Sequence, residues 1–309
     1  MYLIFYTFFL NNQVIRNYCI FHVAKMKYVI IKLEEDMTLR DFFSTIGMDE
    51  HPGRYFFSNF HLIYLLISLI AFIVLFRFLK KQSKQTQNKY ISGFLILMII
   101  LKYAGEALFI YEYYFVEEVY SSYQHSFWDV NTFFSFQLCG IMNIILPIVI
   151  WFDIKPLKDF VFATSILGGL AVMFYPVTVL YGTPFMITLP ILRSTIVHFF
   201  LVFIPLFLIH RGDFSFNKYR WHYIALGLIL TALWATFGNI FIDPTANNMY
   251  LFENPFLNGP IPVINTLPNG WHVLFLAVAV TFGYIIVYHL ALAFENKKVS
   301  FKKLTNRRF

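Results

Sequence analysis

The sequence is poor in charge and lacks the common motifs of nucleotide and metal binding. Only 13% of its 309 residues are charged, whereas 59% are hydrophobic, and the mean hydropathy is +0.63. Soluble domains carry about 25% charged residues, so this composition excludes an ordinary soluble protein. The chain has no P-loop, dinucleotide fingerprint, HExxH or CxxC pair. We therefore expect no cofactor, neither a nucleotide nor a structural metal.

The most prominent feature of the sequence is a series of long apolar segments. A helix needs about 20 apolar residues to cross a hydrocarbon core of about 30 Å. Seven segments meet that requirement: 60–79, 91–115, 131–152, 157–181, 187–210, 222–242 and 271–294. They lack the alternation of apolar and polar residues that is typical of membrane barrel strands. The sequence predicts an all-α, polytopic membrane bundle of about seven transmembrane helices, with the lipid bilayer as its surroundings.

Positive charge is confined to alternate connections between these runs. The basic residues there and in the tail are Arg77, Lys80, Lys81, Lys84, Lys89, Lys155, Lys158, Arg211, Lys218, Arg220, Lys297, Lys298, Lys302, Lys303, Arg307 and Arg308. The opposing connections 116–130, 182–186 and 243–270 contain no Lys or Arg. The positive-inside rule predicts an external N-terminus and a cytoplasmic C-terminus. The net charge of +7 then reflects topology and attraction to anionic lipids, and we expect no nucleic-acid partner.

The N-terminal stretch fits this plan poorly. Its first apolar stretch lacks a basic flank, and the next is interrupted by Lys25 and Lys27. We predict that native translation begins at Met37 or Met48, which would leave Cys139 as the only cysteine and exclude an intrachain disulfide. The expected segments are a non-native or disordered extension (1–36), an external segment (37–59), the transmembrane domain (60–294) and a basic cytoplasmic tail (295–309).

Polar side chains inside the apolar runs are the candidates for function, because such groups are costly in lipid and usually face the bundle interior. They are Lys102, Glu106, Gln137, Cys139, Asn143, Arg193, His198 and Asn239. The third run carries a polar residue at every third or fourth position: Thr132, Ser135, Cys139 and Asn143. This spacing predicts one polar stripe on a continuous helix. Gln137 lies about 200° from Cys139 around that helix and cannot share the stripe.

Three reactive groups are expected at one depth in the outer half of the bilayer. With a rise of 1.5 Å per residue, Cys139 lies about 12 Å, Glu106 about 13 Å and His198 about 16 Å below the outer surface. Arg193 lies about 9 Å deep, where an anionic lipid head group could meet it. The matched depth favours a shared site.

Each of these residues also has a structural interpretation. A single cysteine in a membrane helix is commonly a small packing residue. Lys102 and Glu106 are four residues apart and can neutralise one another. His198 can bond Ser194, one turn earlier on the same face, and Arg193 can extend its charge toward the outer interface.

Five short motifs occur in order along the chain: FSNFHL (57–62), an isolated Glu106, QLCG (137–140), RSTIVHFFLVFIPLF (193–207) and NNMYLFENP (247–255). Between residues 55 and 290 the chain thus resembles the YwaF-like family of bacterial integral membrane proteins, which is related to the eukaryotic transmembrane-protein-164 acyltransferases. It departs from the family pattern at Gln137, where the family commonly has His, and at Asn248, where the family commonly has Tyr.

The resemblance implies cysteine-dependent acyl transfer between membrane lipids, with a phospholipid or lysophospholipid as partner. It implies Cys139 as the nucleophile and His198 as the paired histidine. A thiol in apolar surroundings needs an imidazole to accept its proton, and we assign that role to His198. We expect Glu106 to orient the imidazole and Asn143 to stabilise the oxyanion.

The remaining assignments concern lipid head groups and alternatives. We expect Arg193, His61 and Asn247 to contact the head group, and Gln137 to support the site. A transporter lined by the intramembrane charges is the alternative, although no inverted repeat is visible, and a non-catalytic membrane protein is another. The external connection 243–270 is either a lid or a static cap.

Overall fold

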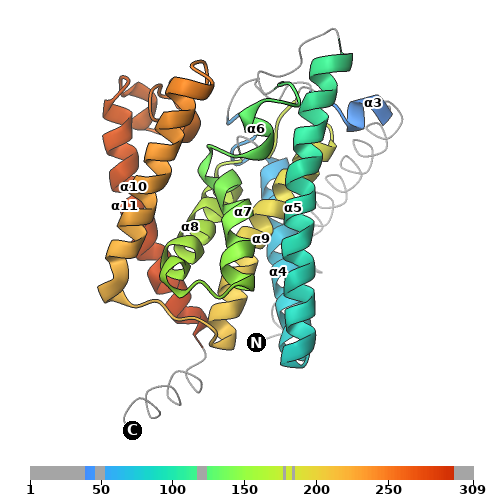
Figure 1. The fold of residues 1–309 in the computed structure, drawn as a ribbon, viewed down its shortest axis with the longest axis vertical. Helices are drawn as coiled ribbons and strands as arrows, with labels where there is room; N and C mark the ends of the chain where they lie inside the picture. Colours follow the sequence, from blue (N-terminus) through green and yellow to red (C-terminus); the bar gives the residue numbers. More distant parts are fainter. Residues whose placement is uncertain (1–38, 46–52, 117–123, 177–178, 183–184, 296–309) are drawn as a thin grey trace, which may run out of the picture.

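The computed structural model describes five parts of the chain: residues 39–45, 53–116, 124–176, 179–182 and 185–295. The predictions made for the N-terminal extension, the translation start and the basic tail after residue 295 lie outside the described residues. Within the described parts all regular secondary structure is helical (Figure 1). The expected all-α polytopic bundle is confirmed.

Six described helices are long and apolar enough to cross a membrane. They are α4 (Asn59–Lys80), α5 (Lys84–Phe115), α8 (Lys155–Phe174), α9 (Leu189–Arg211), α10 (Trp221–Phe237) continued by the π-helical η2 (Gly238–Ile242), and α11 (Trp271–Phe294). A seventh apolar helix, α7 (Leu138–Trp151), is shorter. The remaining elements are short: α3 (Leu39–Phe42), α6 (Val130–Phe133), η1 (Lys218–Arg220), η3 (Asn248–Tyr250) and η4 (Ile264–Thr266).

Helix α9 lies at the centre of the bundle and is the most buried of the six long helices. In its most apolar window 72% of the residues are buried inside the protein, against 6% in α11. It packs against α8 and α5 most extensively and also touches α4, α7 and α11. Its fully buried Phe203 and Phe207 meet Phe72 and Phe76 of α4 edge to face. Because α9 is covered on all sides, a polar side chain on it must be accommodated by neighbouring helices.

The third apolar run is not the continuous helix that its sequence predicts. Helix α6 ends at Phe133, residues 134–137 are non-helical, and α7 begins only at Leu138. The 14 residues of α7 extend about 21 Å, less than the thickness of a hydrocarbon core. The predicted polar stripe is therefore wrong, since Thr132 and Ser135 lie outside α7.

Contacts with α10 hold the interrupted segment. The Phe136 side chain is 2% exposed and stacks on Trp234 at a centroid distance of 5.0 Å. A Cβ atom on Gly238 would overlap the Phe136 ring. The Trp234 Nε1–H donates a 3.0 Å hydrogen bond to the Ser135 carbonyl, and the Ser135 hydroxyl fills the space that the absent Cβ of Gly140 leaves. These contacts fix where α7 starts.

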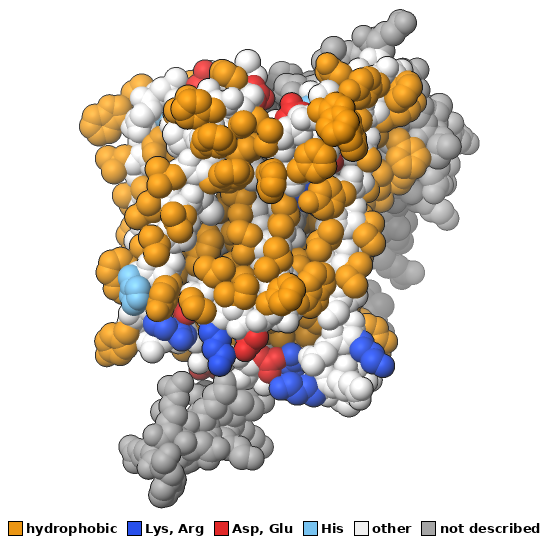
Figure 2. All heavy atoms as spheres, in the orientation of Figure 1, with side chains coloured by type: hydrophobic (Ala, Val, Ile, Leu, Met, Phe, Trp, Pro, Cys, Tyr) orange, Lys and Arg blue, Asp and Glu red, His pale blue; other side chains and the backbone are white. Residues whose placement is uncertain are grey.

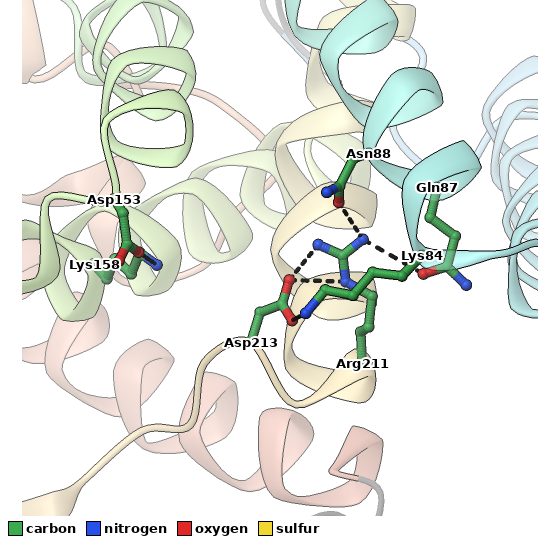
Figure 3. A network of polar contacts seen from close by, with 7 residues as sticks. All are labelled: Lys84, Gln87, Asn88, Asp153, Lys158, Arg211 and Asp213. Carbon is green, nitrogen blue, oxygen red and sulfur yellow. Dashed lines mark hydrogen bonds and ion pairs between the residues drawn. The ribbon is translucent and has the colours of Figure 1, made fainter.

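Basic side chains gather at one end of the bundle, the lower edge in Figure 2. There Arg211 at the end of α9 donates to Asn88 of α5 (2.7 Å) and pairs with Asp213, which also meets Lys84 at 3.4 Å (Figure 3). The network ties the start of α5 to the end of α9. By the positive-inside rule this is the expected cytoplasmic end.

A second ion pair lies at the same end, at the turn between α7 and α8 (Figure 3). Lys158 donates a hydrogen bond to Asp153 and thereby lowers the pKa of that carboxyl. Asp153 also has a left-handed backbone conformation, with φ 50°. The pair therefore accompanies the tight reversal that returns the chain from α7 into α8.

The opposite end is closed by residues 243–270, which asparagine side chains hold in place. The Asn254 amide donates to the carbonyls of Ile264 (2.7 Å) and Leu267 (2.8 Å). Its Oδ1 accepts from the Phe256 N–H at 2.9 Å. Similar bonds join Asn239 to the backbone N–H and side chain of Asn248. So many internal hydrogen bonds favour a static cap over a lid.

Replacing Asn254 by Ala is expected to destabilise the protein by about 1–3 kcal/mol, because three backbone groups in the cap lose their partners. Thermal unfolding in detergent measures the effect. The matched control is Asn59→Ala, since the exposed Asn59 side chain makes no hydrogen bond within the described residues. Equal unfolding temperatures for the two variants would contradict the role given to Asn254.

Candidate functional site

Cys139 lies in the first turn of α7 and faces α8. A Cβ atom on Gly168 of α8 would lie 3.3 Å from its Sγ. The N-cap residue, Gln137, makes no side-chain capping bond. Within the described residues, the backbone N–H groups of Leu138, Cys139 and Gly140 have no acceptor. The cysteine is thus placed at the positive end of a helix dipole, beside free N–H donors.

His198 lies on α9 and is 7% exposed. Its Nδ1 is 2.7 Å from the Ser194 carbonyl oxygen and 3.2 Å from the Ser194 hydroxyl. Because a carbonyl can only accept, Nδ1 carries the proton and Nε2 presents its lone pair. Nε2 has no hydrogen-bond partner among the described residues. This is the form of a histidine that can accept a proton.

A glycine pair in α8 brings the two residues to one place. Gly168 faces the Cys139 sulfur, while a Cβ on the next residue, Gly169, would lie 2.8 Å from the His198 carbonyl oxygen. Cys139 and His198 are each about 20 Å from the basic ends of α7 and α9. The two side chains therefore lie at one level, although no hydrogen bond joins them within the described residues.

No hydrogen bond or ion pair joins Glu106 to His198 within the described residues. Glu106 follows Gly105, which packs on Arg193, and Arg193 lies about 7.5 Å along α9 from His198 toward the outer end. Its carboxylate meets Lys102 Nζ at 3.5 Å and His125 Nε2 at 3.4 Å. The imidazole is instead oriented by the Ser194 carbonyl of its own helix.

Two residues expected at the head group have structural roles. His61 is fully buried, accepts from the Phe57 N–H at Nδ1 (3.0 Å) and donates from Nε2 to the Met173 carbonyl (2.9 Å). Both ring nitrogens are occupied, so His61 joins α4 to the end of α8. Asn247 donates to the Glu253 carbonyl at 2.7 Å and accepts from two N–H groups of the cap. His61 is therefore not available to a lipid, whereas Asn247 is partly exposed and its expected contact with a head group stays a prediction.

Gln137 and Asn143 lie on either side of Cys139 along the chain. The Gln137 Oε1 accepts a 3.1 Å hydrogen bond from the Met249 N–H and so joins the start of α7 to the cap. Asn143, one turn farther into α7, is 8% exposed and its Oδ1 has no hydrogen-bond partner. Ser165 of α8 is fully buried and its hydroxyl is also without a partner. Buried polar groups without partners are uncommon in folded proteins.

Sequence reasoning missed the groups that complete this site. The free N–H groups appear only once α7 is known to begin at Leu138. The signal for the α8 surface was present, because adjacent glycines in an apolar run permit close helix approach. Gly105 on α5 is a further small residue that permits close approach, because a Cβ there would overlap the Arg193 guanidinium. Its role is also not evident from the sequence.

An apolar groove lies between α7 and α10, away from Cys139 and His198. It has a volume of about 280 Å³ and is almost entirely apolar; its walls are formed by Phe134, Ser135, Ile141, Ile144, Ile145, Leu230, Thr231 and Trp234. Ile141 lies two positions from Cys139, about 200° around the helix. The groove therefore opens on the other side of α7.

Comparison with known proteins agrees with the fold. A family model described as the TMEM164 family matches residues 56–288. No curated protein and no solved structure matches the chain. The match spans all seven apolar helices except a few terminal residues of α11, and it confirms the expected relationship to transmembrane-protein-164 proteins; the narrower YwaF-like assignment stays a prediction. This multi-pass, all-helical chain belongs to the TMEM164 family.

Proposed function

We propose that the protein transfers or hydrolyses phospholipid acyl chains through an acyl thioester on Cys139, in the outer half of a bacterial plasma membrane. The observation that carries the proposal is the arrangement around the glycine pair of α8. A thiol beside free N–H donors and a histidine with an unprotonated Nε2 lie at one level on neighbouring helices. Nucleophile, base and oxyanion donors are the parts that acyl transfer requires.

The first half-reaction forms the thioester. His198 Nε2 accepts the proton of the Cys139 thiol, and the thiolate attacks the ester carbonyl of a phospholipid. A carbon–sulfur bond forms, the ester carbon–oxygen bond breaks, and His198 returns the proton to the oxygen of the departing lysophospholipid. The hydroxyl of a lysolipid, or water, then attacks the thioester. His198 takes its proton and returns it to the departing sulfur.

Backbone donors fit the oxyanion better than the side chain that the sequence suggested. The N–H groups of Cys139 and Gly140 belong to the residue that attacks and its neighbour. A donor of this kind contributes about 3 kcal/mol to transition-state stabilisation. Asn143 lies one turn deeper and serves as a supporting donor. Glu106 has no direct role in this mechanism, because it faces Lys102 and His125.

The test is detection of the covalent intermediate. Purified protein is incubated with phosphatidylethanolamine, quenched in acid and digested, and the peptide that contains Cys139 is expected to gain the mass of one acyl chain. Neutral hydroxylamine should remove that mass, because thioesters are cleaved by this reagent and amides are not. The Cys139→Ala protein provides the blank. Turnover of lipid without any acylated peptide would contradict the thioester route.

A further inference from the structure

We propose that Arg193 and Gly105 form a binding site for the phosphodiester of a membrane phospholipid. The inference deepens the proposed function, because it assigns a binding site to the phosphate of the acyl donor, and it rests on that function only for the position of the acyl ester. Its physical basis is a guanidinium held in a fixed place without a protein anion.

The site is a notch in α5. Arg193 projects from the first turns of α9, and a Cβ atom on Gly105 would overlap its Nη1 and Cζ atoms. The Arg193 Cζ also lies 5.5 Å from the centroid of the Phe109 ring, one turn along α5. The absent side chain and the aromatic face together hold the guanidinium against α5.

The guanidinium has no acceptor in the described part of the chain: no hydrogen bond or ion pair to Arg193 occurs there. A guanidinium has five N–H donors and stays charged inside proteins. Leaving such a charge unpaired among apolar helices is costly. Phosphate oxygens match the planar arrangement of these donors and can be bound by two of them at once. An anionic ligand would therefore supply what the protein does not.

The carboxylates near Arg193 are both engaged by other groups. Lys102, 5% exposed, shares the single carboxylate of Glu106 with His125. The other nearby carboxylate, Glu112, accepts from the Thr45 N–H (3.0 Å) and hydroxyl (2.6 Å). Neither acid reaches Arg193 within ion-pair distance. The guanidinium therefore lacks a directly paired acid, and a monoanion such as a phosphodiester would supply one.

The position along α9 favours a lipid over free phosphate. Arg193 lies five residues before His198, about 7.5 Å closer to the outer end of the helix. In a glycerophospholipid the phosphate likewise lies nearer the membrane surface than the acyl esters. A lipid phosphate at Arg193 would direct its ester toward the level of His198 and Cys139.

Binding is tested with two lipids that differ only in the head group. Full-length Cys139→Ala protein, which cannot form the thioester, is titrated in detergent with 1-oleoyl-lysophosphatidylethanolamine and with 1-monooleoylglycerol. The phospholipid is expected to bind about 10-fold or more tightly than the neutral lipid. Adding Arg193→Gln should remove that preference while leaving monooleoylglycerol affinity unchanged.

A matched pair of glycine variants tests the notch itself. Gly105→Ala displaces the guanidinium and should weaken phospholipid binding, whereas Gly93→Ala on the same helix, with nothing within 4 Å of the new Cβ, should not. Equal affinity for both lipids, or a preference that survives Arg193→Gln, would overturn the site. Displacement of the lysophospholipid by millimolar inorganic phosphate would overturn the lipid assignment. Binding that follows the prediction in a protein without acyl transfer activity would support this site and separate it from the proposed function.

Discussion

Replacing His198 by Ala is expected to lower acyl transfer by about 10²–10⁴-fold, the usual contribution of a general base. Cys139→Ala should reduce the activity to background, because no side chain remains to carry the acyl group. The physical reason in both cases is the loss of a group that bonds to, or exchanges a proton with, the reacting atoms. Mass-spectrometric profiling of phospholipid acyl chains in membranes that contain each variant measures the effect.

The control for this prediction is a second histidine of α9. His210 meets the Phe294 carbonyl at 3.0 Å near the basic end, more than three turns from His198. His210→Ala should therefore leave the acyl profile as in wild type. Identical acyl distributions in wild type, Cys139→Ala and His198→Ala would remove the mechanism. An effect of His210→Ala as large as that of His198→Ala would point to a structural role for both histidines.

Replacing Gly169 by Ala is expected to destabilise the protein by about 1–3 kcal/mol and to reduce its activity strongly. The new Cβ would lie 2.6 Å from the Val202 side chain and 2.8 Å from the His198 carbonyl oxygen. A backbone atom cannot move aside without moving α9, so the helix that carries His198 must shift away from α8. Thermal unfolding in detergent and acyl transfer by the same preparation measure the two effects together.

Replacing the neighbouring Gly168 by Ala is expected to separate an effect on activity from an effect on stability. At Gly168 the new Cβ would meet only the Cys139 sulfur, at 3.3 Å, which a side chain can relieve by turning. Gly168→Ala should therefore lower activity with little loss of stability. Gly93→Ala controls for the general effect of alanine in a helix, which is slightly stabilising. If Gly169→Ala unfolds at the wild-type temperature, the close packing of α8 on α9 is not essential.

The sequence predicted the architecture well, because apolar run length and the placement of basic residues follow directly from the physics of the bilayer. Six of the seven expected runs appear as long helices. The third expected run, 131–152, is not one continuous helix, because the length of an apolar run does not indicate where a helix starts within it. Its start is set by tertiary contacts, the Phe136 ring against Gly238 and the Trp234 bond to Ser135, and these involve residues about 100 positions apart.

The candidate site was predicted in part for similar reasons. Counting residues from the basic ends of α7 and α9 gives Cys139 and His198 similar heights, as the depth count from the sequence does. The count could not identify the partners of Glu106, because one of them, His125, lies in a connection outside the apolar runs. His61 and Asn247 both bond the protein backbone, a role that the sequence does not indicate because a polar residue near the outer surface can serve a lipid or the backbone.

The brevity of α7 has a consequence for the lipid around the protein. Helix α5, with 32 residues, extends about 48 Å, more than twice the length of α7. A bilayer adjusts its local thickness to the apolar length of the surface beside it. We therefore expect lipid next to α7 to be thinner than lipid next to α5, so that one molecule would impose a gradient of thickness on its surroundings.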